Sequence, residues 1–192
     1  MAFVVIALIV GGLLFAHSFG AATTGASVTG SRPATPAASP TATVPATQVY
    51  RDPDGLFTIS YPAAWNARPI SQKLGVLPIT LKGAQFQGGN ASLKVLTGKE
   101  LPLIPNQAAQ ADMALLQVMG GHNITSAEPK RIGGQTWTIK RATTDNGDIL
   151  VATSITYQDE LYSIVYSAPS AEFSQDETQT FTPLLNSFAF GA

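Results

Sequence analysis

The chain contains few side chains that could carry out chemistry on a substrate. None of its 192 residues is cysteine, which excludes disulfides, thiolate metal sites and cysteine nucleophiles. Beyond residue 49 there is one histidine, His122, and no Gly-x-Ser-x-Gly or Ser-x-x-Lys pattern supplies an activated serine. His122 follows the helix-stopping pair Gly120-Gly121, so we expect it in an exposed loop. We therefore predict that the protein is not an enzyme and has no catalytic residue and no cofactor; a hydrolase that uses carboxylates alone is the weakest alternative.

Two acidic turns resemble fragments of metal sites. Asp52 and Asp54 imitate the beginning of a calcium loop, and Asp145 with Asp148 forms a second acidic turn. Neither turn is followed by a glutamate at the spacing that a calcium loop needs. A zinc site would need more histidine or cysteine than the chain contains. Because Asp side chains also bind nearby backbone amides, we predict ordinary turns and no metal site at both places.

The charged residues are few and nearly balanced in sign. The chain has eleven Lys and Arg against twelve Asp and Glu, a formal net charge of -1. A nucleic-acid binder needs a basic stripe that neutralises phosphates, but the only adjacent basic pairs are Lys130-Arg131 and Lys140-Arg141. Lys140 and Arg141 would point to opposite faces of a strand. We predict solvated edge residues there and no nucleic-acid partner.

The amino-terminal segment is almost free of charge, since Arg32 is the only charged residue before position 50. Residues 2–16 form an unbroken run of apolar residues and glycine, and the uncharged stretch continues to about residue 22. A helix that crosses a membrane needs about 20 residues. Residues 1–22 are therefore predicted to be a transmembrane anchor or a cleaved signal segment. An anchor would make this a single-pass protein of the cell membrane with an extracytoplasmic domain, whereas cleavage would make it a secreted protein.

Residues 23–48 are rich in Ala, Thr and Pro and show no hydrophobic period. Such a segment cannot bury enough apolar surface to offset the entropy that ordering costs, and its spaced prolines favour extended conformations. We predict a disordered linker, which would hold the rest of the chain away from the membrane. Residues 49–192 are long enough to form one globular domain with one core.

The rest of the chain shows a strand pattern that ends in a meander. Aromatic and β-branched segments bounded by turn residues predict strands. These segments are residues 56–61, 76–82, 91–97, 123–128, 135–143, 149–158 and 161–168. The last three are separated by Asp145-Asn146-Gly147-Asp148 and by Asp159-Glu160, and Asn-Gly is a strong hairpin signal. Apolar residues occupy both faces of the last two strands, so both faces need a covering layer.

Two helices can supply that cover. Residues 106–119 place apolar side chains on one stripe, with Asn106 as the expected cap. A second helix is expected from Ser174, where Ser174-Gln175-Asp176-Glu177 fits a capping box, and Pro183 should kink or restart it. We therefore predict an α+β fold, a mostly antiparallel β-sheet flanked by helices and preceded by an apolar N-terminal helix and a disordered linker.

Residues 50–65, YRDPDGLFTISYPAAW, resemble the opening motif of PsbP-like domains, in which a short strand, a turn and a strand lead to an aromatic-Pro-x-x-Trp corner. Residues 184–190, LLNSFAF, are similar to the last helix of that superfamily running into a Ser-Phe strand. The resemblance implies a PsbP-like α/β/α sandwich over residues 49–192. The superfamily includes bacterial membrane-tethered proteins of unassigned role, so the resemblance implies a fold and leaves the function open.

Together these features predict a non-catalytic, membrane-tethered extracytoplasmic domain that binds another protein or assembly at the cell surface. The N-terminal helix would contact the membrane, and the protein partner is unknown. The alternative is a carrier of a small molecule or lipid, because the aromatic residues around Trp65 and Trp137 either belong to the core or line a groove for an apolar ligand. The sequence assigns no residue to a ligand or partner site.

Overall fold

The structure of the protein is a computed structural model that describes residues 46–75, 79–101 and 104–191. The predicted anchor or signal segment at residues 1–22 and nearly all of the predicted linker at residues 23–48 lie outside these ranges. None of the helices within them is long and apolar enough to cross a membrane. The first element, β1 (Thr47–Arg51), begins inside the range that the sequence assigns to the linker.

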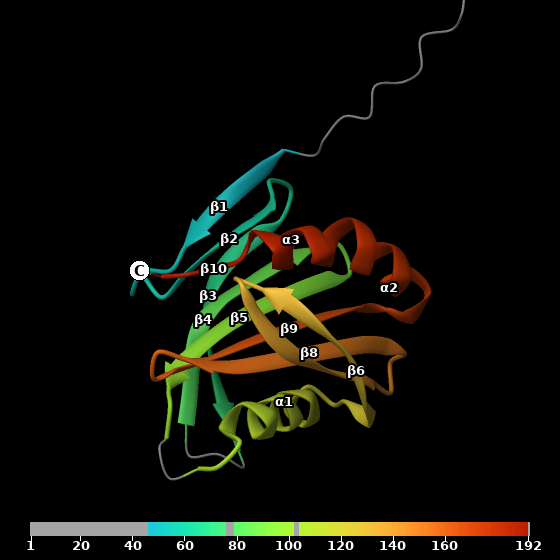
Figure 1. The fold of residues 1–192 in the computed structure, drawn as a ribbon. Helices are drawn as coiled ribbons and strands as arrows, with labels where there is room; N and C mark the ends of the chain where they lie inside the picture. Colours follow the sequence, from blue (N-terminus) through green and yellow to red (C-terminus); the bar gives the residue numbers. More distant parts are fainter. Residues whose placement is uncertain (1–45, 76–78, 102–103, 192) are drawn as a thin grey trace, which may run out of the picture. The chain divides into compact units, whose positions relative to one another are not determined.

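A seven-stranded antiparallel sheet forms the centre of the domain (Figure 1). Its strands, in chain order, are β3 (Asn66–Leu74), β4 (Ile79–Gly88), β5 (Ala91–Lys99), β6 (His122–Ile132), β7 (Gln135–Thr143), β8 (Asp148–Tyr157) and β9 (Glu160–Pro169). They lie side by side in the order β3-β4-β5-β9-β8-β7-β6. β7, β8 and β9 form the predicted meander, and Gly147 in its Asn-Gly turn has a positive φ of 82°, as such turns require.

A smaller sheet brings the two ends of the domain together. Its order is β1-β2-β10, where β2 is Phe57–Pro62 and β10 is Ala189–Phe190. β10 pairs with only two residues of β2. Beyond it, the backbone N–H of Ser60 donates to the hydroxyl oxygen of Ser187 (2.9 Å), and that hydroxyl donates to the Leu184 carbonyl (2.7 Å) and also lies 3.3 Å from the Ser60 carbonyl. The Ser187 side chain thus takes the place of a further residue of β10.

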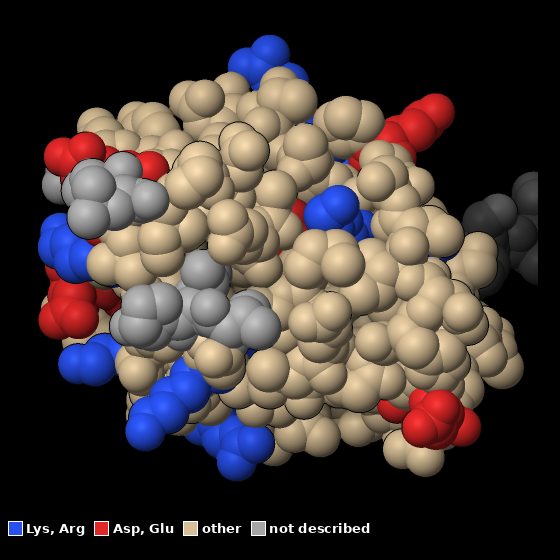
Figure 2. Space-filling model, turned by 90° about the horizontal axis from the view of Figure 1, so that it is seen from below, with Lys and Arg blue, Asp and Glu red and all other residues tan. Residues whose placement is uncertain are grey.

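One face of the large sheet is covered by α1 (Gln107–Val118). Its buried residues, which include Ala111 and Leu115, form a core cluster with Leu150 of β8 and Val165 of β9. Figure 2, seen from the side of α1, shows a broad area without charged side chains. The only charged residue of α1 is Asp112, which is fully buried.

The other face is covered by the C-terminal helical segment and by the small sheet (Figure 1). α2 (Ser170–Asp176), a π-helical turn (Glu177–Phe181) and α3 (Thr182–Ser187) follow β9 without a loop. The rings of Phe173 and Phe181 lie 6.1 and 4.6 Å from that of Tyr166. The predicted cover on both faces and the predicted α+β class are therefore confirmed.

The predicted helix starts are wrong in their details. Asn106 does precede α1, but its backbone is left-handed, with φ of 53°, and its side chain makes no capping hydrogen bond. Ser174 lies inside α2 rather than at its start. The helix begins earlier because the N–H of Ser170 donates to the Gly147 carbonyl as soon as β9 ends (3.1 Å), and this start brings Phe173 into the core.

Two further predictions concern the helix at Pro183 and the strand at residues 76–82. The kink or restart expected at Pro183 takes the form of a π-helical turn directly before α3, while the backbone stays helical through Phe181 and Thr182, so the helix does not restart with a cap. The strand predicted at residues 76–82 is described only from Ile79, and it continues as β4 to Gly88. β3 was not predicted, because most of its residues are exposed and it contains Pro69.

Asp112 is a buried carboxylic acid between α1 and the sheet. Neither of its carboxyl oxygens has a hydrogen-bond partner among the described residues. The nearby hydroxyl of Ser154 is paired with that of Ser163, 2.8 Å away. Burial raises the pKa of Asp112 to about 7, against smaller opposing effects of Ser154 and Lys140. The folded domain therefore favours the neutral acid.

We expect Asp112 to make the stability of the domain fall as the pH rises. Below about pH 4 the carboxyl is neutral in both the folded and the unfolded chain. Between about pH 4 and 7 it ionises in the unfolded chain only, which lowers the free energy of unfolding by roughly 2–4 kcal/mol. This loss of stability persists above pH 7. The variant Asp112→Asn should match the wild type near pH 4 and exceed it at pH 8. Urea unfolding followed by tryptophan fluorescence measures both.

The exposed residue Asp54 provides the control. Asp54→Asn, which removes a carboxylate from the surface, should not reproduce the gain in stability at pH 8. A difference between Asp112→Asn and the wild type that does not change with pH would contradict the expectation.

Candidate functional site

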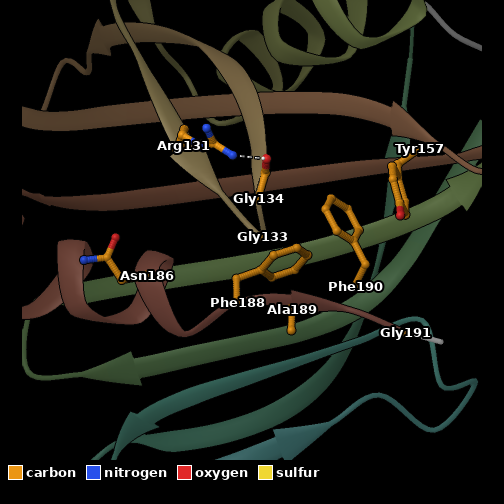
Figure 3. Close-up of a pocket in the computed structure, with 9 residues that line it drawn as sticks. All are labelled: Arg131, Gly133, Gly134, Tyr157, Asn186, Phe188, Ala189, Phe190 and Gly191. Carbon is orange, nitrogen blue, oxygen red and sulfur yellow. Dashed lines mark hydrogen bonds between the residues drawn. The ribbon is translucent and has the colours of Figure 1, made fainter.

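An open cleft lies between the β6–β7 turn and the end of the chain's last strand (Figure 3). Its volume is about 530 Å³, which is within the range of ligand-binding pockets. We call it the Phe190 cleft. It is lined by Arg131, Gly133, Gly134, Tyr157, Asn186, Phe188, Ala189, Phe190 and Gly191.

Aromatic rings form the apolar wall of the Phe190 cleft. The rings of Tyr157 and Phe190 are stacked with centroids 4.2 Å apart, and the ring of Phe188 meets Phe190 edge-on at 5.1 Å. Trp137 lies behind them, fully buried, and its indole N–H donates to the Ile132 carbonyl (3.0 Å). The wall is therefore fixed by the core, while Tyr157 and Phe190 keep part of their surface exposed.

Gly133 allows the β6–β7 turn to lie directly on this aromatic wall. Its φ is 56°, and a Cβ at this position would be 2.9 Å from the ring of Phe190 and 3.1 Å from that of Phe188. The neighbouring Gly134 also has a positive φ, of 80°, but a Cβ there would meet no atom within 4 Å. Gly133 thus has both a conformational and a steric requirement for glycine.

Apart from the hydroxyl of Tyr157, the polar side-chain groups of the cleft belong to Arg131 and Asn186. Arg131 is exposed and donates one hydrogen bond from Nη2 to the Gly134 carbonyl (2.9 Å), as Figure 3 shows. Within the described ranges, no Asp or Glu forms an ion pair with Arg131. Most of its donors are therefore free to bind an anionic group.

A second, smaller cleft adjoins the first one and shares Arg131 and Asn186 with it. It has a volume of about 280 Å³, and its other lining residues are Lys130, Ile132, Thr182 and Leu185. It lies between β6 and α3. The two clefts together form a surface that runs from α3 along β6 to the Tyr157 ring.

An ion-pair network ties the π-helical turn to the sheet beside this surface. Glu177 accepts hydrogen bonds from Lys130 Nζ (2.9 Å) and Arg141 Nη2 (3.0 Å). Burial alone would raise the pKa of Glu177, but the hydrogen bonds and charges of the two cations outweigh it and lower this pKa. Burial and the charge of Glu177 raise the pKa of Tyr166, whose hydroxyl lies 3.4 Å from the carboxylate.

The basic residues singled out in the sequence are thus more buried than expected. Lys130 and Arg141 were predicted to be solvated edge residues, but both are only partly exposed and share Glu177. The prediction that Lys140 and Arg141 point to opposite faces is confirmed, because Lys140 faces Asp112 of α1 and Arg141 faces Glu177. Sequence spacing could not show that Glu177 would reach two separate strands.

The remaining candidate residues lie away from the Phe190 cleft. His122 is exposed, as predicted, but it is the first residue of β6 rather than part of a loop, and its Nδ1 is 3.6 Å from Asp145. A carboxylate oxygen of Asp52 accepts the N–H groups of Asp54 and Leu56, an ordinary turn. Among the residues described, no three His, Cys, Asp or Glu side chains gather as metal ligands would.

The aromatic residues considered for an apolar groove mostly belong to the core. Trp137 and Tyr166 are fully buried, and Tyr162 is nearly so. Trp65 remains partly exposed and packs edge-on against Phe181 at 6.4 Å. The residues that do line a cleft, Tyr157 and Phe190, were not singled out in the sequence, although the alternation in Phe188-Ala189-Phe190 was a usable signal.

No protein-family model and no curated protein matches the sequence, whereas several solved structures are similar. Cyanobacterial PsbP (CyanoP) from Synechocystis matches with a TM-score of 0.52 and 15% identity, over 78% of this chain and 95% of that one. This similarity shows that the chain has the PsbP-like fold predicted from its opening and closing motifs.

Two further structures match less well, each with a TM-score of 0.46. The Ran-binding protein Mog1p of Saccharomyces cerevisiae is 10% identical, over 76% of this chain and 95% of its own. LpqN of Mycobacterium tuberculosis, which is involved in cell envelope biogenesis, is 11% identical, over 77% of this chain and 91% of its own.

We expect Gly133→Ala to destabilise the domain more than Gly134→Ala. Both variants place a side chain at positive φ, which costs about 1 kcal/mol. Only Gly133→Ala also pushes a methyl group into Phe188 and Phe190, which adds roughly 1–3 kcal/mol. Urea unfolding of both variants measures the difference, and equal losses would show that the turn does not rest on the aromatic wall.

Proposed function

We propose that the protein is a non-catalytic binding domain, tethered to the membrane on its extracytoplasmic side, that holds an extended segment of another protein in the Phe190 cleft. The observation that carries this proposal is the pairing of a partly exposed aromatic wall with Arg131, a cation without an acidic partner among the described residues. Such a surface can bind an apolar side chain on its rings and an anionic group at Arg131.

The composition of the cleft favours binding over catalysis. Its lining contains no carboxylate, imidazole or aliphatic hydroxyl, so it offers no pair of groups that could act as nucleophile and base. Much of the lining is glycine and the backbone of β10 and of the β6–β7 turn. The glycines leave room for the backbone of an extended peptide to approach the cleft.

The chemistry of the cleft defines the segment that would fit. An apolar side chain, aromatic or proline included, would lie on the rings of Tyr157 and Phe190. A carboxylate close to it, from Asp, Glu or the end of a chain, would pair with Arg131. Asn186 and Lys130 of the adjoining cleft extend the polar side of this surface. This favours a peptide over a lipid, because the long apolar tail of a lipid would find little apolar surface beyond the two rings.

The tether is the second part of the proposal, and the amino-terminal sequence supports it. Residues 1–22 have the length and apolar character of an anchor, and residues 23–48 have the composition of a linker. An anchor followed by a long linker lets a domain reach a partner at a distance from the membrane. The same segments would give a secreted binding domain if the first were cleaved.

The peptide proposal can be tested with a random peptide library displayed on phage and selected against the immobilised chain. We expect the enriched peptides to place an acidic residue near an aromatic residue or proline. Synthetic versions should bind Arg131→Gln about tenfold more weakly than the wild type, because a charge-assisted hydrogen bond is lost. Isothermal titration calorimetry measures the affinities.

Arg68→Gln on β3 is the matched control, since Arg68 is also an exposed arginine but lies away from the cleft. It should leave the affinities unchanged. Equal loss in both variants, or enrichment without acidic residues, would contradict the proposal. Binding of a fluorescent fatty acid in the absence of any peptide binding would favour the apolar-ligand alternative instead.

The tether can be tested in cells that carry the chain with a C-terminal tag. We expect the tag in the membrane fraction. In intact cells whose plasma membrane is accessible to added protease, the protease should remove the tag. A cytosolic protein of similar size should resist the protease in the same cells. A tag that is soluble and protected would contradict the tether.

A further inference from the structure

Among the described residues, β1 forms an edge with little of the usual protection against pairing with another strand, since Arg51 is its only charged residue. Edge strands in natural proteins carry proline, charged residues or bulges that prevent such pairing. β3, at one edge of the large sheet, contains Pro69, and β6, at the other edge, contains Pro129 and two register shifts. β1 is the outermost strand of the small sheet (Figure 1), contains no proline and pairs with β2 residue by residue without a shift.

The hydrogen bonds of the small sheet show which backbone groups of β1 point to β2. The N–H of Asp52 donates to the Phe57 carbonyl (2.9 Å), and the N–H of Ala63 donates to the Ala46 carbonyl (2.8 Å). In an antiparallel pair, every second residue bonds to its neighbour. The even-numbered residues of β1 are therefore the ones that bond to β2.

The odd-numbered residues point their N–H and C=O groups to the free edge. Ser60, which lies opposite Val49, gives an independent check, because its N–H donates to the Ser187 hydroxyl on the other side of β2. Val49 is thus in a pair without mutual hydrogen bonds. Its backbone groups, and those of Thr47 and Arg51, are directed away from β2.

Val49 lies at the centre of this edge and is also unusually exposed. It is one of two large hydrophobic side chains that are exposed among the described residues, with 59% of its surface accessible. A strand of five residues with a central exposed valine can meet a copy of itself symmetrically. A two-fold axis at Val49 places the two valine side chains next to each other.

We propose that β1 pairs with β1 of a second copy of this chain, antiparallel and centred on Val49. In this register Val49 faces Val49 of the second copy, and Thr47 faces Arg51. These are the residues with free backbone groups, so the register satisfies all of them with about six hydrogen bonds. The contact is self-complementary, as in most homodimers.

Charge placement agrees with this register. Arg51 is the only charged residue of β1, and it faces Thr47 rather than another arginine, so no like charges lie directly opposite each other. The interface of one short strand is small, and the association is correspondingly weak in dilute solution. A shared membrane surface, if the proposed tether holds, would raise the local concentration and favour the pair.

Single cysteines can test the pairing, because the natural chain has none. In a directly facing pair with mutual hydrogen bonds, the Cα atoms are about 5.5 Å apart, a distance that a disulfide can span. We expect the full chain with Val49→Cys to form a disulfide-linked dimer on oxidation with copper phenanthroline, both in isolated membranes and as a concentrated purified protein in solution. Ser60→Cys, one strand further from the axis, should not link, since its two copies would be about 14 Å apart.

A mixture of variants tests the register itself. Thr47→Cys and Arg51→Cys should each remain unlinked alone, because their own copies are about 14 Å apart, and should link to each other when co-expressed. Absence of a link at Val49, equal linking at Val49 and Ser60, or self-linking of Thr47→Cys would overturn the proposal. None of these variants changes Arg131, so the result is independent of the peptide proposal.

Discussion

The burial of β8 and β9 on both faces is the constraint on which the rest of the domain depends. In β9, Val165 belongs to the core beneath α1, and its neighbour Tyr166 belongs to the opposite core. Strands that are apolar on both sides need a complete layer on each. One helix supplies the first layer. The second is assembled from the C-terminal helical segment and the small sheet, and the Phe190 cleft lies where the end of that sheet meets the β6–β7 turn.

The sequence was informative where burial imposes a clear pattern. The strands of the meander and the helix α1 follow from local rules of periodicity and turn chemistry, and both are confirmed, although Val118, expected on the buried stripe of α1, is exposed. The errors have physical reasons of their own. β3 is mostly exposed and shows no alternation of apolar and polar residues. α2 starts directly after β9, where the N–H of Ser170 donates to the Gly147 carbonyl, rather than at the best capping sequence.

The candidate site was harder to predict because its residues are distant in the sequence. The sequence marks Gly133 as a turn residue and Phe190 as a strand residue. Their contact depends on β10 returning to pair with β2, more than a hundred residues earlier in the chain. The same holds for Glu177, whose two cationic partners come from β6 and β7. Local sequence patterns carry no information about such long-range contacts, which depend on the packing of the whole domain.

The Ser187 hydroxyl limits how far the small sheet can grow. It accepts the N–H of Ser60 and lies 3.3 Å from the Ser60 carbonyl, the groups that a longer neighbouring strand would use, and β10 itself covers only two residues. An incoming strand on that side would find no run of free backbone groups. A fibril needs two open strand edges on every copy, so that each added copy leaves an open edge for the next one. Among the described residues the small sheet offers such an edge only at β1, so a strand added there leaves no second edge of the same sheet for the next copy.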